Sequence, residues 1–153
     1  MPPLCLSTVK SVTRQKPTSH HQRINKIHIA EATAKKITNE QLKKPALLAT
    51  KFTMEDDFYI QKLMDYGLEP IIPSNESRKI LHTIIYDELC FNVTTDESRE
   101  KFIDISNEVS KEGADSIILG CTEVGMLLNS DNVNLPVYDT VQVHCKEIFN
   151  SIL

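Results

Sequence analysis

Short apolar runs alternate with amphipathic stretches along most of the chain. Runs typical of buried strands lie at residues 46–50, 68–73, 114–119 and 135–138, and residues 27–29 are a further strand candidate. The stretches between them carry apolar residues three and four positions apart, which predicts helices with one buried face. Strands that alternate with helices predict an α/β fold, with a Rossmann-like parallel sheet flanked by helices.

Capping patterns and glycines indicate where several helices begin and end. Good helix formers run from Ala30 to about Ile37. Thr53 and Asp56 form a capping box, which predicts a helix from near Met54 to Gly67. Thr94 and Glu97 form a second capping box, which predicts a later helix that ends at Gly113. Its buried face is expected to carry Phe102, Ile105 and Val109.

The final amphipathic stretch predicts a helix with one apolar side, made by Val141, Ile148, Phe149 and Ile152. In the middle of the chain, Cys90 follows a helix with apolar residues at helical spacing, and we interpret it as a core residue. Asn92 tolerates the left-handed conformation that closes a helix, so we expect that helix to end there.

Charge separates residues 1–26 from the rest of the chain. This segment holds five basic residues and no acidic one, while the whole chain of 153 residues has a net charge of −4, so the remainder carries −9. We interpret residues 1–26 as a disordered or degenerate segment. The protein is expected to be cytoplasmic, and organellar targeting by the acid-free N-terminus is the alternative.

Composition narrows the function classes. A hydrophobic content of 41% suffices for the core of one domain, or of one and a fraction. No apolar run reaches membrane-spanning length, so we expect no membrane partner. The net negative charge disfavours nucleic acid. The four cysteines, Cys5, Cys90, Cys121 and Cys145, are widely spaced and form no metal-binding pair, so we expect reduced thiols and no metal site.

The most informative stretch is residues 114–128, where an apolar strand ends at Gly120 and turns into a helix. Cys121 then meets the free N–H groups and positive dipole end of that helix. Both favour the thiolate of a side chain whose usual pKa is about 8.5. A cysteine at a strand end is also an ordinary core residue, and that alternative stays open. Thr50 and Asp139 likewise follow strands, at the edge where parallel sheets bind ligands.

Several runs resemble, in order, the aspartate/glutamate racemase family. They are His28–Thr33, Phe52-Thr53-Met54 with Phe58-Tyr59, Tyr86–Cys90, Gly113–Glu123, and Pro136–Thr140 with His144. The resemblance covers residues 27–153. It implies a second-domain core at 45–132, with 27–44 and 133–153 as a remnant of the first domain. Glutamate racemases usually have His where Glu123 stands, which points to the aspartate type.

The resemblance implies an amino-acid racemase that uses no pyridoxal phosphate or other cofactor. The family moves the α-proton with two cysteines, one from each of two similar domains. Cys121 matches one of them, with Glu123 as its proton partner or as the group that tunes it, and Cys5 is the candidate for the other. The matching substrate-binding candidates are Thr50, Thr53, Thr122, Asp139 and Thr140. The implied substrate is a small amino acid, aspartate or glutamate.

The first-domain motifs of that family are missing. The chain has no Trp, and no Gly-Gly strand precedes residue 27. An incomplete sheet exposes edge strands and apolar surface, so we expect a homo-oligomer. The alternative to the enzyme is a truncated, inactive relative that binds small dicarboxylates or serves as an interaction module.

Overall fold

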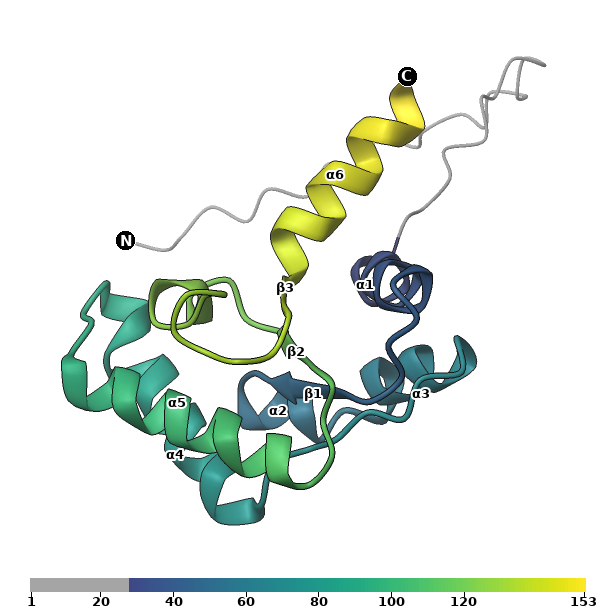
Figure 1. The fold of residues 1–153 in the computed structure, drawn as a ribbon. Coiled ribbons are helices and arrows are strands. Elements are labelled where there is room, and N and C mark those ends of the chain that lie inside the picture. Colours follow the sequence, from purple (N-terminus) through teal and green to yellow (C-terminus); the bar gives the residue numbers. More distant parts are fainter. Residues whose placement is uncertain (1–27) are drawn as a thin grey trace, which may run out of the picture.

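Three short parallel strands form the sheet at the centre of the molecule (Figure 1). The computed structural model describes residues 28–153. In this part of the chain the sheet order is β1 (Pro45–Leu48), β2 (Ser116–Leu119) and β3 (Val137–Asp139). Leu48 pairs with Leu119, and Leu119 pairs with Asp139, so the three strands end at the same edge. The predicted α/β fold with a parallel sheet is confirmed.

Helices cover the sheet on both sides. In Figure 1, α4 and α5 lie together on one side, and α1 and α3 lie on the other. The helices are α1 (Ile29–Asn39), α2 (Lys51–Met54), α3 (Asp57–Asp65), α4 (Asn75–Asp87), α5 (Asp96–Lys111) and α6 (Thr140–Ile152), with 3-10 turns η1 (Leu89–Phe91) and η2 (Val124–Met126). α6 begins directly at the end of β3 and extends away from the body (Figure 1). None of the helices in residues 28–153 has the length and apolar character needed to cross a membrane.

The core forms where the helix faces meet β1 and β2. All four residues of β1 and of β2 are buried, and the predicted face of α5 is buried as well, with Phe102 fully enclosed. The end of β2 fits closely against β1: a Cβ added at Gly120 would lie 2.9 Å from both the Ala49 Cβ and the Leu47 Cδ1. Glycine is therefore required at that position for steric reasons.

Two predicted strands are absent from the described residues. Ile29 is the first residue of α1, and His28 is its N-cap, with Nδ1 accepting a hydrogen bond from the Ala30 N–H at 3.2 Å. The strand prediction for 27–29 is therefore wrong for the two residues that the structure describes. The stretch 68–73 contributes only an isolated bridge between Ile71 and Ala46, because its prolines remove ladder donors.

The capping predictions identified the right turns with the wrong residues. Thr53 is not an N-cap: Thr50 caps α2, and Asp56 caps the separate helix α3. In the same way Thr95, rather than Thr94, caps α5. Each true cap accepts a backbone N–H two or three residues ahead, which a neighbouring residue cannot reach.

The segment after α4 mixes a confirmed prediction with a wrong one. Asn92 adopts the expected left-handed conformation at φ 58°, but it closes η1, because α4 already ends at Asp87. Cys90, which we expected in the core, is exposed, because η1 turns its outer residues to solvent while Leu89 is buried.

Two tyrosines attach α1 to the rest of the fold. The Tyr66 hydroxyl, just after α3, donates to Glu31 Oε1 at 2.7 Å near the start of α1. The Tyr138 hydroxyl of β3 donates to Glu40 at the other end of the helix. Burial and the bond to Glu40 raise the pKa of Tyr138, so this hydroxyl stays protonated as a donor.

Candidate active site

The turn after β2 brings a thiol and a carboxylate together. Gly120 ends the strand, and the half-buried Cys121 donates a hydrogen bond from Sγ to Glu123 Oε2 at 2.9 Å. Glu123 also accepts a hydrogen bond from the Thr122 side chain, which is exposed. Three consecutive residues that the sequence analysis selected thus form one hydrogen-bonded group.

The electrostatics of this group differ from the sequence expectation. Burial, followed by the hydrogen bond to Glu123, raises the pKa of the Cys121 thiol to about 11. The thiol hydrogen bond and that of Thr122 lower the pKa of Glu123. The raised pKa of Cys121 and the lowered pKa of Glu123 describe the same state, with the proton on the sulfur and the negative charge on the carboxylate.

The expected thiolate was wrong because no α-helix follows Cys121. Residues 121–123 form a turn, and η2 has only three residues. So short a segment aligns too few peptide dipoles to stabilise a negative charge. The neighbouring carboxylate repels a thiolate instead. A second sulfur adds to this, since the Cys90 thiol also contributes to the raised pKa.

Two threonine hydroxyls lie at the end of the neighbouring strand. Thr50 and Thr53 are half-buried, and their Oγ1 atoms are 3.1 Å apart. Thr50 and Cys121 are each the second residue beyond the paired positions Leu48 and Leu119. Because paired strands lie about 4.8 Å apart, the two residues leave the sheet at neighbouring points of the same edge. The structure thus places Thr50 and Cys121 at one edge, as the strand ends predicted.

The polar residues after β3 are used by the fold. Asp139 caps α6, with Oδ1 accepting from the N–H groups of Val141 at 2.9 Å and Gln142 at 3.1 Å. The Thr140 side chain is 3% exposed, and its hydroxyl donates to the Leu119 carbonyl at 2.9 Å. These bonds give both residues a structural role. The hydroxyl hydrogen of Thr140 is used in the bond to Leu119, so we do not propose Thr140 as a substrate contact.

A small cavity lies beside Asp139. It has a volume of about 200 Å³ and lies between η2, the end of β2 and the start of α6, with Leu119, Gly125 and Asp139 among its lining residues. A Cβ on Gly125 would lie 3.2 Å from Asp139 Oδ2, so the cap and the η2 turn are close neighbours. Asp139 therefore stays a candidate for contact with a small ligand.

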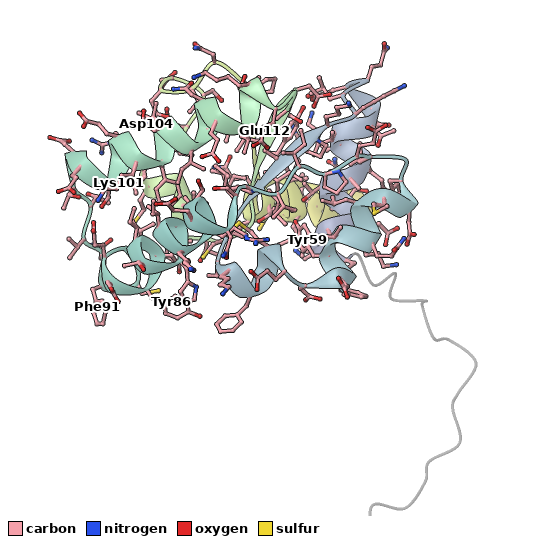
Figure 2. All side chains as sticks on the ribbon, turned by 90° about the horizontal axis from the view of Figure 1, so that it is seen from below. Tyr59, Tyr86, Phe91, Lys101, Asp104 and Glu112 are labelled. Atoms are coloured by element: carbon pink, nitrogen blue, oxygen red, sulfur yellow. The ribbon has the colours of Figure 1, made fainter. Side chains whose placement is uncertain are left out.

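His82 is a polar residue at this edge that the sequence analysis missed. Its Nδ1 accepts a hydrogen bond from the Lys51 N–H at 3.4 Å, at the start of α2. Its ring contacts Phe52 and Tyr86, with centroid distances of 5.5 and 4.6 Å. Figure 2 shows Tyr86 and Phe91 at the same end of the molecule, both pointing outward. No local pattern marks His82, because its contact with α2 comes from the packing of α4.

Cys5, the candidate for a second thiol, lies outside the described residues. Cys90, Cys121 and Cys145 are free thiols. Within residues 28–153, no group of three or more His, Cys, Asp or Glu side chains is arranged to hold a metal ion.

Comparison with known proteins identifies similar chains. A family model described as Asp/Glu/Hydantoin racemase matches residues 21–148. A candidate Asp/Glu racemase from Yersinia pestis is 35% identical, with a TM-score of 0.79 over 81% of this chain. An aspartate racemase homologue from Pyrococcus horikoshii is 32% identical, with a TM-score of 0.76 over 82% of this chain. A Picrophilus torridus aspartate racemase, at 24% identity and a TM-score of 0.65 over 82% of this chain, supports the fold alone.

The chain spans only about half the length of these solved structures. The matched part covers 54% of the Yersinia chain, 55% of the Pyrococcus chain and 52% of the Picrophilus chain.

Proposed function

The chain belongs to the Asp/Glu/Hydantoin racemase family, and on that premise we propose that it interconverts the L and D forms of aspartate or glutamate without pyridoxal phosphate. The observation that carries the proposal is the 2.9 Å hydrogen bond between Cys121 Sγ and Glu123 Oε2 at the carboxyl end of the central strand. It supports the proposal because a thiol and a carboxylate lie together at the edge where parallel sheets bind ligands.

The reaction requires a base on one face of the α-carbon and an acid on the other. Cys121 is proposed to be one of these groups. With a pKa of about 11 it is a thiol at neutral pH, so it begins as the acid. A base on the opposite face, for which Cys5 is the candidate, first takes the α-proton as the α-C–H bond breaks. Cys121 then gives its proton to the α-carbanion: its S–H bond breaks, the new C–H bond forms, and the thiolate remains. In the opposite direction the thiolate removes the α-proton.

After burial, the Glu123 carboxylate is the second cause of the high proton affinity of the Cys121 sulfur. In the free protein its carboxylate disfavours the thiolate, and its own lowered pKa makes it a weak acceptor for the thiol proton. A bound amino acid brings an ammonium group near the sulfur, and an adjacent positive charge lowers the pKa of a thiol. Burial and Glu123 together therefore keep Cys121 protonated until the substrate is bound.

Thr50 and Thr53 are proposed to bind the substrate carboxylate, together with the exposed Thr122. The hydroxyl groups of Thr50 and Thr53 share one hydrogen bond at 3.1 Å. One hydroxyl hydrogen is used in that bond, so the other can donate to a carboxylate oxygen. Their position beside Cys121 orients the α-carbon toward the sulfur.

The second candidate function is ligand binding without turnover. It is favoured by the electrostatics of the site, since a pKa of about 11 keeps Cys121 protonated in the free protein and leaves little thiolate to take an α-proton. Such a protein would bind dicarboxylate amino acids at the same edge.

Exchange of the α-hydrogen in D₂O distinguishes the two functions. Loss of the Cα–H NMR signal shows that at least one acid/base group removes the α-proton. Chiral chromatography measures inversion, which requires two acid/base groups on opposite faces of the α-carbon. We expect the wild-type chain to exchange L- or D-aspartate or glutamate, and Cys121→Ser to lower the rate by roughly 10²- to 10⁴-fold. Cys145→Ser, at an exposed thiol on α6, is the matched control and should leave the rate unchanged.

Three results would contradict the proposed racemase reaction at Cys121. Wild-type chain that exchanges none of the four amino acids is not a racemase, and calorimetric binding of the same amino acids would then support the binding function. Exchange that survives in Cys121→Ser would remove Cys121 from the reaction. Exchange without inversion would show a single acid/base group, with Cys121 retained and racemisation excluded.

A further inference from the structure

The short helix α2 carries Thr53 but has few bonds of its own to hold it in shape. It has four residues, and a helix of that length is not stable alone in water. The first N–H groups of a helix have no partner within it. In α2 the Thr50 hydroxyl oxygen accepts the Thr53 N–H at 3.4 Å, and the N–H of Lys51, the first helical residue, needs another acceptor. Contacts from outside α2 must therefore help to fix its hydroxyl groups.

His82 of α4 supplies this acceptor. Its Nδ1 accepts the Lys51 N–H at 3.4 Å. An accepting Nδ1 carries no proton, so the hydrogen of the neutral ring is on Nε2. Two aromatic rings hold the imidazole in place, Phe52 from α2 and Tyr86 from the next turn of α4, with centroid distances of 5.5 and 4.6 Å. His82 thus acts as a second cap of α2, provided by another helix.

A second contact, one turn away on α4, holds the other end of α2. Arg78 Nε lies 3.6 Å from Oε1 of Glu55, the C-cap of α2. Arg78 and His82 are four positions apart, and so are Glu55 and Lys51. Four helical residues span about 6 Å, so the two contacts have matching spacing on both helices. α4 thereby holds α2 at both ends.

We propose that His82 is a positioning residue, which raises the affinity for the substrate carboxylate by fixing the hydroxyl groups of Thr50 and Thr53. The inference rests on the proposed function in one respect, that these two hydroxyls bind the carboxylate. Their Oγ1 atoms are 3.1 Å apart, and the Lys51 N–H that His82 holds lies in the turn between them. A carboxylate contact is made equally before and during proton transfer, so His82 should affect KM more than kcat.

The first test is the kinetics of α-hydrogen exchange by the full chain with L-aspartate and L-glutamate. His82→Ala removes the acceptor and should raise KM roughly five- to ten-fold, while kcat changes less than about two-fold. His82→Asn should restore most of the affinity, since its side-chain oxygen can accept the Lys51 N–H. Thr83→Ala, at the exposed neighbouring residue of α4, is the control and should match the wild type.

The split between KM and kcat excludes a purely structural effect. A variant that only loses folded protein has a lower kcat and the wild-type KM. That result for His82→Ala would overturn the inference, as would a KM that His82→Asn does not recover. If the wild type binds these amino acids without turnover, the calorimetric Kd takes the place of KM.

A double-mutant cycle tests whether His82 acts through the hydroxyl pair. Thr53→Val removes one hydroxyl group with little change of shape and should raise KM by itself. In the Thr53→Val background, His82→Ala should raise KM much less than it does in the wild type, because residues that act through one contact are not additive. Independent effects that multiply would overturn the inference.

Amide hydrogen exchange in the absence of substrate separates the inference from the proposed function. By NMR, the Lys51 amide should exchange roughly five- to ten-fold faster in His82→Ala and recover in His82→Asn. An unchanged Lys51 amide, or a faster one with an unchanged KM, overturns the inference and leaves the proposed function intact. A wild-type chain that neither binds nor exchanges any of the four amino acids contradicts the proposed function, and the effect of His82 on affinity falls with it.

Discussion

Two junctions at the same edge of the sheet use polar side chains in opposite ways. Leu119 and Asp139 are paired residues of adjacent parallel strands, and the chain leaves the sheet just beyond each of them. After β2, Cys121 and Glu123 bond to each other through their side chains. After β3, Asp139 and Thr140 bond to backbone groups, one capping α6 and the other holding the end of β2.

The difference arises from the segment that comes after each strand. A 13-residue helix follows β3, and its first N–H groups require acceptors, which Asp139 provides. Only a turn and a three-residue 3-10 segment follow β2, so the polar atoms there are not needed for capping. A polar residue at a strand end is the stronger candidate for chemistry when no long helix begins beside it.

The largest effect is expected from a change that disturbs the β2 junction itself. Gly120→Ala places a Cβ 2.9 Å from the Ala49 and Leu47 side chains, and such overpacking lowers the free energy of unfolding by about 1–3 kcal/mol. Urea denaturation measures it. Gly125→Ala is the control, since its Cβ meets only the Asp139 carboxylate at 3.2 Å and should cost less. Equal losses would mean that the close approach of β1 and β2 is not the constraint.

An intermediate effect is expected at the β3 junction. Asp139→Ala removes the N-cap of α6 and should cost about 1 kcal/mol of unfolding free energy in the same urea experiment. Alkylation of Cys121, followed peptide by peptide with mass spectrometry, should be unchanged. Asp139 would belong to the candidate site if the alkylation rate changed, or if α-hydrogen exchange were lost with little loss of stability. Either result would show that the two junctions do not differ in the way described above.

The smallest effect is expected from the charge at Glu123. Glu123→Gln removes a carboxylate that raises the pKa of Cys121, so more thiolate forms at pH 8. We expect alkylation of Cys121 by iodoacetamide to accelerate roughly three- to ten-fold, because the thiolate fraction grows as the pKa of the thiol falls. An unchanged or slower rate would show that burial alone holds the proton on the sulfur.

The same thiol predicts the sign of a pH effect in the wild type. The folded pKa of about 11 lies above the usual value of a free thiol. The unfolded chain therefore loses this proton first as the pH rises. The contribution of Cys121 to stability is complete below the usual thiol pKa and is lost as the pH rises through about 11. Urea midpoints above pH 9 should fall less in Cys121→Ser than in the wild type.

The sequence was sufficient for features set by local pattern. A few adjacent residues suffice to predict three features: the burial of β2, the left-handed conformation of Asn92, and the neighbouring positions of Cys121 and Glu123. Hydrophobic runs report burial whatever packs on them, so the α/β fold was predictable.

Features set by distant contacts were not predictable. His82 reaches the start of α2 only through packing of α4, and the thiol state of Cys121 depends first on its burial by the surrounding fold. The strand that ends at Gly120 was predicted to turn into a helix, yet the chain forms only η2 before the loop that leads to β3. Neither outcome can be derived from local spacing.

The two tyrosine contacts of α1 have a mechanical consequence. Tyr66 holds one end of this helix beside α3, and Tyr138 holds the other end on β3. A stiff element anchored at both ends transmits a displacement along its length. A movement of α3 is thereby conveyed to the strand from which α6 starts, across a distance that no single side chain spans.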